Sequence, residues 1–184
     1  MINKYFRYLV TLGTLAALGL AGCSSADTKN DPTLLVNSNF ETLAGWLPEG
    51  LDATLTREKA HSGNYAIKVD ATHEYSLGYR ALLGRLHNTR IKKIKVSAWA
   101  FVSTGGTASL ITTVGNPVVP TNKPLLWEAL ELGKGNTFGN WVEVSKVLII
   151  PETAAATSIL GMYLWRTSGD QPIYLDDLRV TLEP

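Results

Sequence analysis

The chain has 184 residues, with 17 Lys and Arg against 16 Asp and Glu, so its formal net charge is +1. This balance argues against a nucleic-acid-binding surface, which requires Lys and Arg to be clustered on one face. The single cysteine, Cys23, leaves no partner for a disulfide within the chain. Stability must therefore come from a packed core, with or without a bound metal.

The first residues have the pattern of a secretion signal. Lys4 and Arg7 are followed by an apolar run from Tyr8 to Leu20. The run ends in Leu20-Ala21-Gly22-Cys23, which resembles the lipobox of bacterial lipoproteins. The resemblance implies that residues 1–22 are cleaved as a signal peptide and that Cys23 carries diacylglycerol on its sulfur and a fatty acid on its new amino group. The alternatives are an ordinary signal peptide before an incidental cysteine, or an N-terminal membrane helix, although the run is short for a span.

Residues 23–33 are polar, lack hydrophobic periodicity and are expected to form a tether behind the lipidated cysteine. Ser24 rather than Asp follows Cys23, which is typical of proteobacterial lipoproteins delivered to the outer membrane. We therefore expect a lipid-anchored protein of the bacterial cell envelope, located at the outer membrane. Cleavage would remove Lys4 and Arg7, leaving 15 basic and 16 acidic residues and a net charge of −1.

Residues 34–184 have the right length for one domain with a single core. Short β-rich runs are divided by Gly, Pro, Asn and Asp, and no helix-length window holds an apolar stripe of helical period. This pattern predicts an all-β fold, an antiparallel sandwich or barrel. The expected strands are residues 34–37, 53–57, 65–70, 75–82, 94–103, 108–114, 125–132, 142–150, 157–167 and 173–182.

The last expected strand, residues 173–182, contains a carboxylate at an apolar position. A period of two predicts that Asp176 shares the core-facing side with Leu178 and Val180. An ionised carboxylate there is costly unless it is paired, hydrogen-bonded or bound to a metal. The simpler alternative is that Asp176 caps a turn or accepts backbone N–H bonds. Asp177 has the opposite parity and is expected at the surface.

Five short motifs are spread over residues 34–184. They are Asn37-Ser38-Asn39-Phe40-Glu41, the run from His61 to Val69 preceded by Trp46, the run from Lys95 to Ala100, Trp141 to Val144 followed by Pro151, and Tyr174 to Val180. In this order they resemble the jelly-roll carbohydrate-binding modules attached to bacterial cellulases and xylanases. The resemblance implies an antiparallel β-sandwich of the galactose-binding-like type. It says less about the ligand, since a fold does not determine a function.

Such modules commonly hold a structural calcium ion that joins the N-terminal segment to the last strand. Carried over to this sequence, the resemblance implies carboxylate ligands from Glu41 and Asp176 and backbone carbonyl oxygen from the Ser62-Gly63 turn. Calcium takes six to eight oxygen ligands, so further carbonyl groups or waters would be needed. The alternative is that both carboxylates hydrogen-bond backbone amides without a metal.

Glycan binding requires aromatic faces that stack on sugar C–H bonds. The proposed ligand-binding residues are Tyr79, Trp127, Tyr163 and Trp165, with Trp46 and Tyr75 as further candidates. Tyr163 and Trp165 share a parity, so both would lie on one face of their strand. Loops 115–124 and 133–140 are expected to rim a cleft. For each aromatic residue, burial in the core is the alternative.

Catalytic patterns are weak in this sequence. His61, His73 and His87 lack metal-ligand spacing, and there is no Gly-x-Ser-x-Gly motif or phosphate-binding glycine loop. We therefore predict a non-catalytic lipoprotein that binds a glycan or a glycosylated partner, with no nucleic-acid partner. The alternative is a structural or protein-interaction lipoprotein that keeps the jelly roll without sugar binding.

Overall fold

The computed structural model describes residues 31–47, 53–116, 123–133 and 138–184. One compact unit spans Pro32–Pro184. The predicted signal peptide and Cys23 lie outside the described residues, as do most of the two loops expected to rim a cleft. Among the residues that are described, no helix has both the length and the apolar character needed to cross a membrane.

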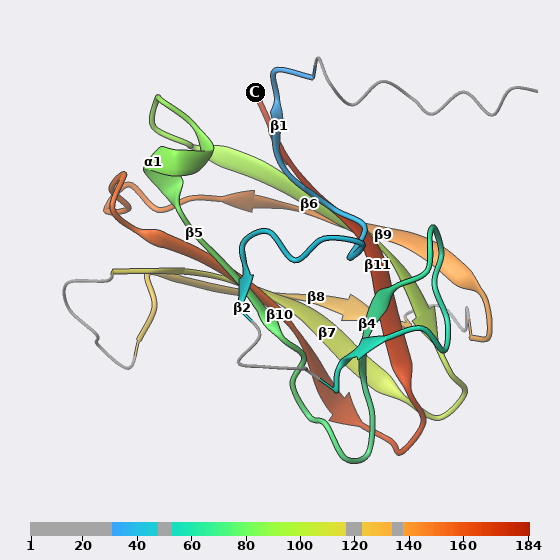
Figure 1. Ribbon diagram of the computed structural model, residues 1–184. Helices are drawn as coiled ribbons and strands as arrows, with labels where there is room; N and C mark the ends of the chain where they lie inside the picture. The colour runs from blue at the N-terminus through green and yellow to red at the C-terminus, as the bar shows by residue number, and fades with distance from the viewer. Residues whose placement is uncertain (1–30, 48–52, 117–122, 134–137) are drawn as a thin grey trace, which may run out of the picture. The chain divides into compact units, whose positions relative to one another are not determined.

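The described residues form two antiparallel β-sheets and one short helix (Figure 1). This confirms the predicted all-β antiparallel sandwich, and every expected strand overlaps an observed one. The two-residue strand at Trp46 was not expected. The elements are β1 (Leu34–Ser38), β2 (Trp46–Leu47), β3 (Leu55–Thr56), β4 (Ala66–Val69), β5 (Gly78–Leu82), α1 (Leu83–Leu86), β6 (Lys93–Val102), β7 (Thr107–Gly115), β8 (Leu126–Leu132), β9 (Trp141–Ile149), β10 (Ile159–Ser168) and β11 (Ile173–Leu182).

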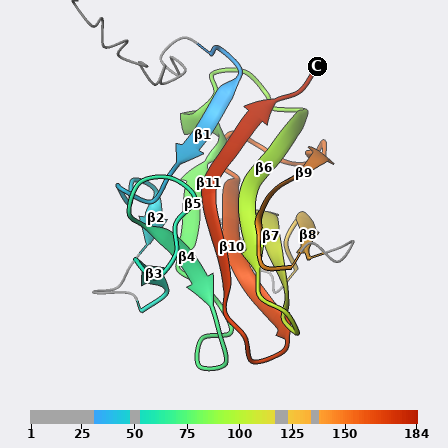
Figure 2. The ribbon, with the colours of Figure 1, turned by 90° about the vertical axis from the view of Figure 1, so that its right-hand side faces the viewer.

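The first sheet, called sheet A, has the order β3-β4-β11-β6-β9, and β1 also pairs with β11. The second, sheet B, has the order β2-β5-β10-β7-β8. In Figure 2, β11 lies between β1 and β6 at the centre of sheet A. One half of β11, Ile173–Leu175, pairs with β4, and the half from Leu178 pairs with β1 along the same edge. The last strand therefore organises sheet A.

The core lies between the two sheets and follows the alternation of the strands. On β6 every second side chain from Ile94 to Val102 is at most 3% exposed, whereas the intervening ones are half-buried. On β10, Leu160, Met162 and Leu164 are fully buried. The burial of these aliphatic chains drives the two sheets together. The same alternation directs Tyr163 and Trp165 to the outer face of sheet B.

A β-bulge in β11 changes the predicted face of Asp176. Asp176 lies opposite Trp99 of β6, and Arg179 lies opposite Ser97, so β11 has one residue more than its partner between these pairs. Asp177, in the bulge, has a left-handed φ of 48°, which Asp tolerates better than most residues.

The extra residue reverses the parity of β11. Leu175 lies in the core with Leu178 and Val180, and Asp176 lies on the outer face of sheet A. The prediction that Asp176 shares the core-facing side with Leu178 and Val180 was therefore wrong. A period-two pattern cannot show a bulge, because a slip of one residue turns every preceding side chain over.

Candidate functional site

Four aromatic residues gather on the outer face of sheet B. Tyr163 and Trp165 come from β10, Trp127 comes from β8, and Tyr75 forms a bridge opposite Trp165. The Tyr75 and Trp165 rings are stacked with centroids 6.2 Å apart and planes 8° apart. Trp127 meets Trp165 edge-to-face at 6.2 Å, and Tyr75 meets Tyr163 at 6.0 Å. We call these four residues the aromatic platform.

The platform is both exposed and held in place. Tyr75 is 52% exposed and Trp127 is 47% exposed, so their faces are open to a ligand. The indole Nε1 of Trp165 donates to Oε1 of Glu74 at 3.0 Å. This bond lowers the pKa of Glu74, and the same carboxylate raises the pKa of the Tyr75 hydroxyl. Glu74 therefore fixes the orientation of two rings of the platform.

A groove of about 440 Å³ lies next to the platform on the same sheet. Its lining includes Tyr163 and three glycines, Gly78 of β5, Gly161 of β10 and Gly115 of β7. A Cβ atom at Gly161 would lie 2.6 Å from Oγ1 of Thr113, so a side chain there would disturb the neighbouring strand. Glycines inside strands leave space for a close approach by a ligand or another backbone. Because these three glycines have no side chains, the backbone itself forms the floor of the groove.

Polar groups lie at the other end of the groove. Arg80 and Asn116 line it together with Tyr163. Arg80 also lines a second hollow of about 330 Å³, which it shares with Arg85 and Ile159. The outer face of sheet B thus has an aromatic end and a basic end joined by glycines.

The Tyr79 ring lies in the core, although Tyr79 is among the residues that line the groove, and its role in ligand binding stays a prediction. Tyr79 is 6% exposed and belongs to the hydrophobic core. It lies opposite Met162, whose side chain is also buried, and its ring meets that of Trp46 at 5.7 Å. Burial raises the pKa of the Tyr79 hydroxyl. Trp46 is likewise in the core, and its Nε1 donates to Oγ of Ser38 at 2.9 Å.

The predicted metal ligand Asp176 accepts backbone hydrogen bonds. Its side chain is fully buried, and Oδ2 accepts N–H bonds from His61 at 2.8 Å and Ser62 at 3.0 Å. Its Oδ1 accepts the N–H of Asp177 at 2.7 Å. Burial raises the pKa of Asp176, and the three amide bonds act against this shift. These backbone amides satisfy the buried carboxylate without a metal, which is the alternative that the sequence left open.

Glu41 binds the next part of the same turn. Its Oε1 accepts N–H bonds from Asn64 at 2.6 Å and Tyr65 at 2.9 Å, and these bonds lower the pKa of Glu41. Gly63 has a φ of 60°, and a Cβ there would collide with the Glu41 carboxylate. The turn from His61 to Tyr65 is therefore fixed from two sides by Asp176 and Glu41.

The structure brings the four predicted calcium residues together, but it surrounds the carboxylates with N–H donors. Calcium takes oxygen ligands, and here the carboxylates of Glu41 and Asp176 accept backbone N–H bonds. Within the described ranges, no group of three or more His, Cys, Asp or Glu residues is arranged to hold a metal. Calcium at this turn stays a prediction.

Asp177 also holds the turn and is half-buried rather than a plain surface residue. Its Oδ2 lies 2.6 Å from Nδ1 of His61, and its Oδ1 accepts the hydroxyl of Ser62 at 2.6 Å. The His61 ring stacks on Trp99 with centroids 3.9 Å apart. Because the Ser62 hydroxyl donates to Asp177 and not to His61, these residues do not form a nucleophile–base pair.

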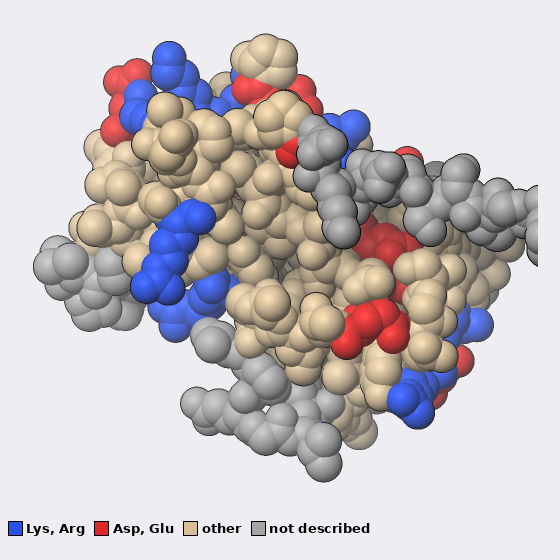
Figure 3. All heavy atoms as spheres, turned by 45° about the horizontal axis from the view of Figure 1, so that its top comes forward, with Lys and Arg blue, Asp and Glu red and all other residues tan. Residues whose placement is uncertain are grey.

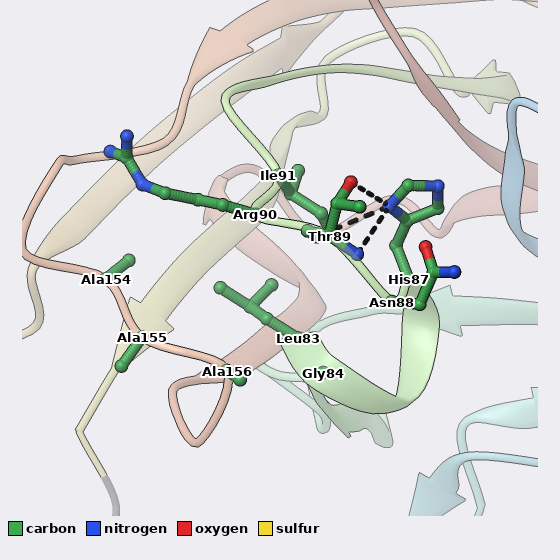
Figure 4. Close-up of a pocket in the computed structure, with 10 residues that line it drawn as sticks. All are labelled: Leu83, Gly84, His87, Asn88, Thr89, Arg90, Ile91, Ala154, Ala155 and Ala156. Atoms are coloured by element: carbon green, nitrogen blue, oxygen red, sulfur yellow. Dashed lines mark hydrogen bonds between the residues drawn. The ribbon is translucent and has the colours of Figure 1, made fainter.

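A further hollow of about 260 Å³ lies beside α1 (Figure 4). Its lining includes His87, Arg90 and the segment Ala154–Ala156. The Nδ1 of His87 is already engaged by the Thr89 hydroxyl at 3.0 Å, and the Arg90 side chain extends away from His87. This hollow has no aromatic residue in its lining, so it lacks the stacking surface of the groove on sheet B.

Charged side chains of both signs are interspersed over the face drawn in Figure 3, and the described residues form no continuous basic surface there. The absence of a nucleic-acid partner stays a prediction. Two features of the groove were missed from the sequence, its glycine floor and Arg80. Gly78 and Gly161 stand inside expected strands, which is the signal that could have indicated a close approach.

Comparison with known proteins gives no matching family model and no matching curated relative. Solved structures do match. The tandem CBM22-1–CBM22-2 domain of Paenibacillus barcinonensis Xyn10C aligns at 18% identity with a TM-score of 0.60, over 84% of this chain and 52% of that chain. The CBM22-2 xylan-binding domain of the same protein aligns at 18% identity and a TM-score of 0.57, over 81% and 99%.

A third structure, the CBM22-1–GH10 modules of Clostridium thermocellum xylanase 10B with xylohexaose, aligns at 18% identity and a TM-score of 0.57, over 83% of this chain and 29% of that chain. This chain thus spans about half of the tandem and less than a third of the xylanase fragment. At these identities the likeness concerns the fold. The domain has the jelly-roll β-sandwich fold of carbohydrate-binding modules, as the sequence motifs predicted.

Proposed function

We propose that this protein is a non-catalytic module that binds a glycan chain on the outer face of sheet B. The observation that carries the proposal is the exposed aromatic platform beside a groove with a glycine floor. Aromatic faces stack on the C–H bonds of sugar rings, and convergent polar groups such as Arg80 and Asn116 address hydroxyl groups. The groove is an open channel along β10, which suits a chain better than a small enclosed ligand.

Xylan is the first glycan to test. Structures with this fold include domains described as xylan-binding and one complexed with xylohexaose. The likeness to them supports a β-linked polysaccharide as ligand, and the aromatic platform is compatible with several backbones, since every pyranose ring has a C–H face.

Isothermal titration of residues 24–184 with xylan, mixed-linkage glucan and mannan tests the proposal. We expect Trp165→Ala and Trp127→Ala each to lose about 1–3 kcal/mol of binding free energy for the bound glycan, with little change in melting temperature. Trp141→Ala is the matched control, because Trp141 lies on the outer face of sheet A. It should keep full affinity.

Two results would contradict the proposal. Unchanged affinity in both platform variants would remove the platform from the binding site. Failure of the folded wild-type domain to bind any glycan on an array would favour the alternative of a structural or protein-interaction lipoprotein.

We also propose that the domain is anchored by lipid on Cys23 in the bacterial cell envelope, at the outer membrane. The support is the Leu20-Ala21-Gly22-Cys23 motif and the polar segment that follows it. Cys23→Ala should accumulate as an unprocessed precursor that does not incorporate labelled fatty acid. Normal processing and labelling of this variant would disprove the anchor.

A further inference from the structure

Two arginines form the basic end of the groove. Arg80 lies opposite Gly161 on the outer face of sheet B and is exposed. It lines both the main groove and the adjoining hollow, and Arg85, which follows in α1, lines the same hollow. Arg80 therefore belongs to both hollows, and Arg85 lines the one that adjoins the groove.

The charges of Arg80 and Arg85 are not neutralised within the described part of the chain. Neither side chain forms an ion pair or hydrogen bond there, whereas Lys68 pairs with Glu58 at 2.7 Å and Lys146 pairs with Glu128 at 2.7 Å. The open guanidinium groups are available to an anionic ligand.

The acidic residues of this face lie at the opposite end of the groove. Glu74 is bound to the Trp165 indole, and Glu131 lies opposite Ser109, which in turn lies opposite Trp165. A negative group on a ligand would therefore be repelled from the platform end and attracted to the arginine end. The two ends of the groove therefore differ in the sign of the charge that they present to a ligand.

The spacing suits a sugar chain that meets both ends. Tyr163 is two residues from Gly161 along β10 and on the same face, which is about 7 Å in an extended strand. A pyranose ring stacked on Tyr163 would have the glycine floor beside it and the Arg80 side chain at the next strand. A guanidinium group binds a carboxylate with two parallel N–H···O bonds, a geometry that neutral hydroxyl groups do not match.

We propose that the groove selects acidic glycans, in which a uronic-acid carboxylate binds Arg80 and Arg85 while a neighbouring sugar ring stacks on the platform. This inference rests on the proposed glycan-binding function and adds the chemical class of the ligand. Its test compares polymers that differ in the carboxylate and in little else.

The probes are glucuronoxylan and polygalacturonate, each with its carboxyl-reduced neutral form. We expect the wild-type domain to bind at least one acidic polymer about three- to tenfold more tightly than its reduced form at low salt, with the difference shrinking as salt is added. Arg80→Gln should remove most of this difference, because it should weaken binding of the acidic form more than binding of the neutral form. Arg90→Gln removes the same charge from an exposed site outside the groove, and should leave the difference intact.

The outcomes separate this inference from the proposed function. Equal wild-type affinity for the acidic and reduced forms, with binding still lost in Trp165→Ala, would overturn the acidic selectivity and keep glycan binding. Equal weakening of both forms by Arg80→Gln would overturn it as well, since Arg80 would then bind hydroxyl groups. Binding of neither form of either polymer, nor of any neutral glycan, would overturn both proposals.

Discussion

The outer faces of the two sheets make an instructive pair. Both carry large aromatic residues, Trp99 and Phe101 on β6 of sheet A and Tyr163 and Trp165 on β10 of sheet B. The same alternation places them outward in both strands. On sheet A, however, a loop covers the rings, and on sheet B the neighbouring aromatic residues stay open.

The cover on sheet A comes from the segment between β3 and β4. His61 stacks on Trp99, and Nζ of Lys59 lies 4.3 Å from the centroid of the Phe101 ring. Asp176 and Asp177 hold this segment through four hydrogen-bonding contacts with His61 and Ser62. An outward aromatic residue is therefore accessible to a ligand only where no loop is fixed over it.

Removing the fixing carboxylate should have the largest effect. We expect Asp176→Ala to lower the free energy of unfolding by about 3 kcal/mol, because the amides of His61 and Ser62 lose their buried acceptor. Asp177→Ala, at a half-exposed site, should cost about 1 kcal/mol. Urea unfolding measures both. If Asp176→Ala left stability unchanged, Asp176 would not be what holds the cover.

Tyr174, on the covered face of sheet A, should make the free energy of unfolding depend on pH in alkaline solution. Burial, helped by the hydrogen bond to Glu58, raises the pKa of Tyr174 to about 12. A raised folded-state pKa gives a contribution that is complete below the unfolded value near 10 and is lost as the pH rises to about 12.

We therefore expect the free energy of unfolding to fall by about 1–2 kcal/mol between pH 10 and pH 12. Tyr174→Phe should remove this part of the fall, and Tyr163→Phe on the open face of sheet B provides the matched tyrosine control. Identical pH profiles for wild type and Tyr174→Phe would contradict the assignment.

Filling the open face should affect binding and leave stability nearly unchanged. A Cβ at Gly78 would meet the carbonyl oxygen of Met162 at an ordinary 3.7 Å, so the backbone accepts a side chain there. Gly78→Leu should place that side chain in the groove and weaken glycan binding about tenfold, which corresponds to about 1.4 kcal/mol. Gly105→Ala is not a suitable control for Gly78→Leu, because Gly105 has a φ of 88°.

Ser145→Leu is the control for Gly78→Leu, since it places the same side chain at an exposed site on the outer face of sheet A. Titration of both variants with the glycan bound by wild type measures the effect. Full affinity in Gly78→Leu would show that the ligand does not use this part of the groove.

The smallest effect should come from chelation. If backbone amides alone satisfy Asp176 and Glu41, excess EDTA will leave the melting temperature where it is in added calcium. A fall with EDTA that calcium reverses, and that Asp176→Asn abolishes, would instead establish the predicted calcium site. Differential scanning calorimetry of protein loaded with calcium at the start decides between these results.

Much of the fold follows from local sequence pattern. The sequence pattern predicted both β6 and β10 as strands, because side-chain direction along a strand depends on neighbouring residues alone. The same pattern placed Tyr163 and Trp165 on one face, where the structure adds Trp127 and Tyr75. Tyr79 shows the limit, since an aromatic residue in a strand belongs to either face until the register is known.

What the tertiary structure alone decided is which outward surface stays open. The bulge at Asp177 turns Asp176 away from the core. Its carboxylate then accepts hydrogen bonds from the backbone N–H groups of His61 and Ser62, which lie 115 and 114 residues earlier in the chain. Glycines of three different strands form the floor of one groove. Arg80 of β5 lies opposite one of them, Gly161 of β10. These features depend on register and on contacts between distant segments, for which a single sequence carries no periodic signal.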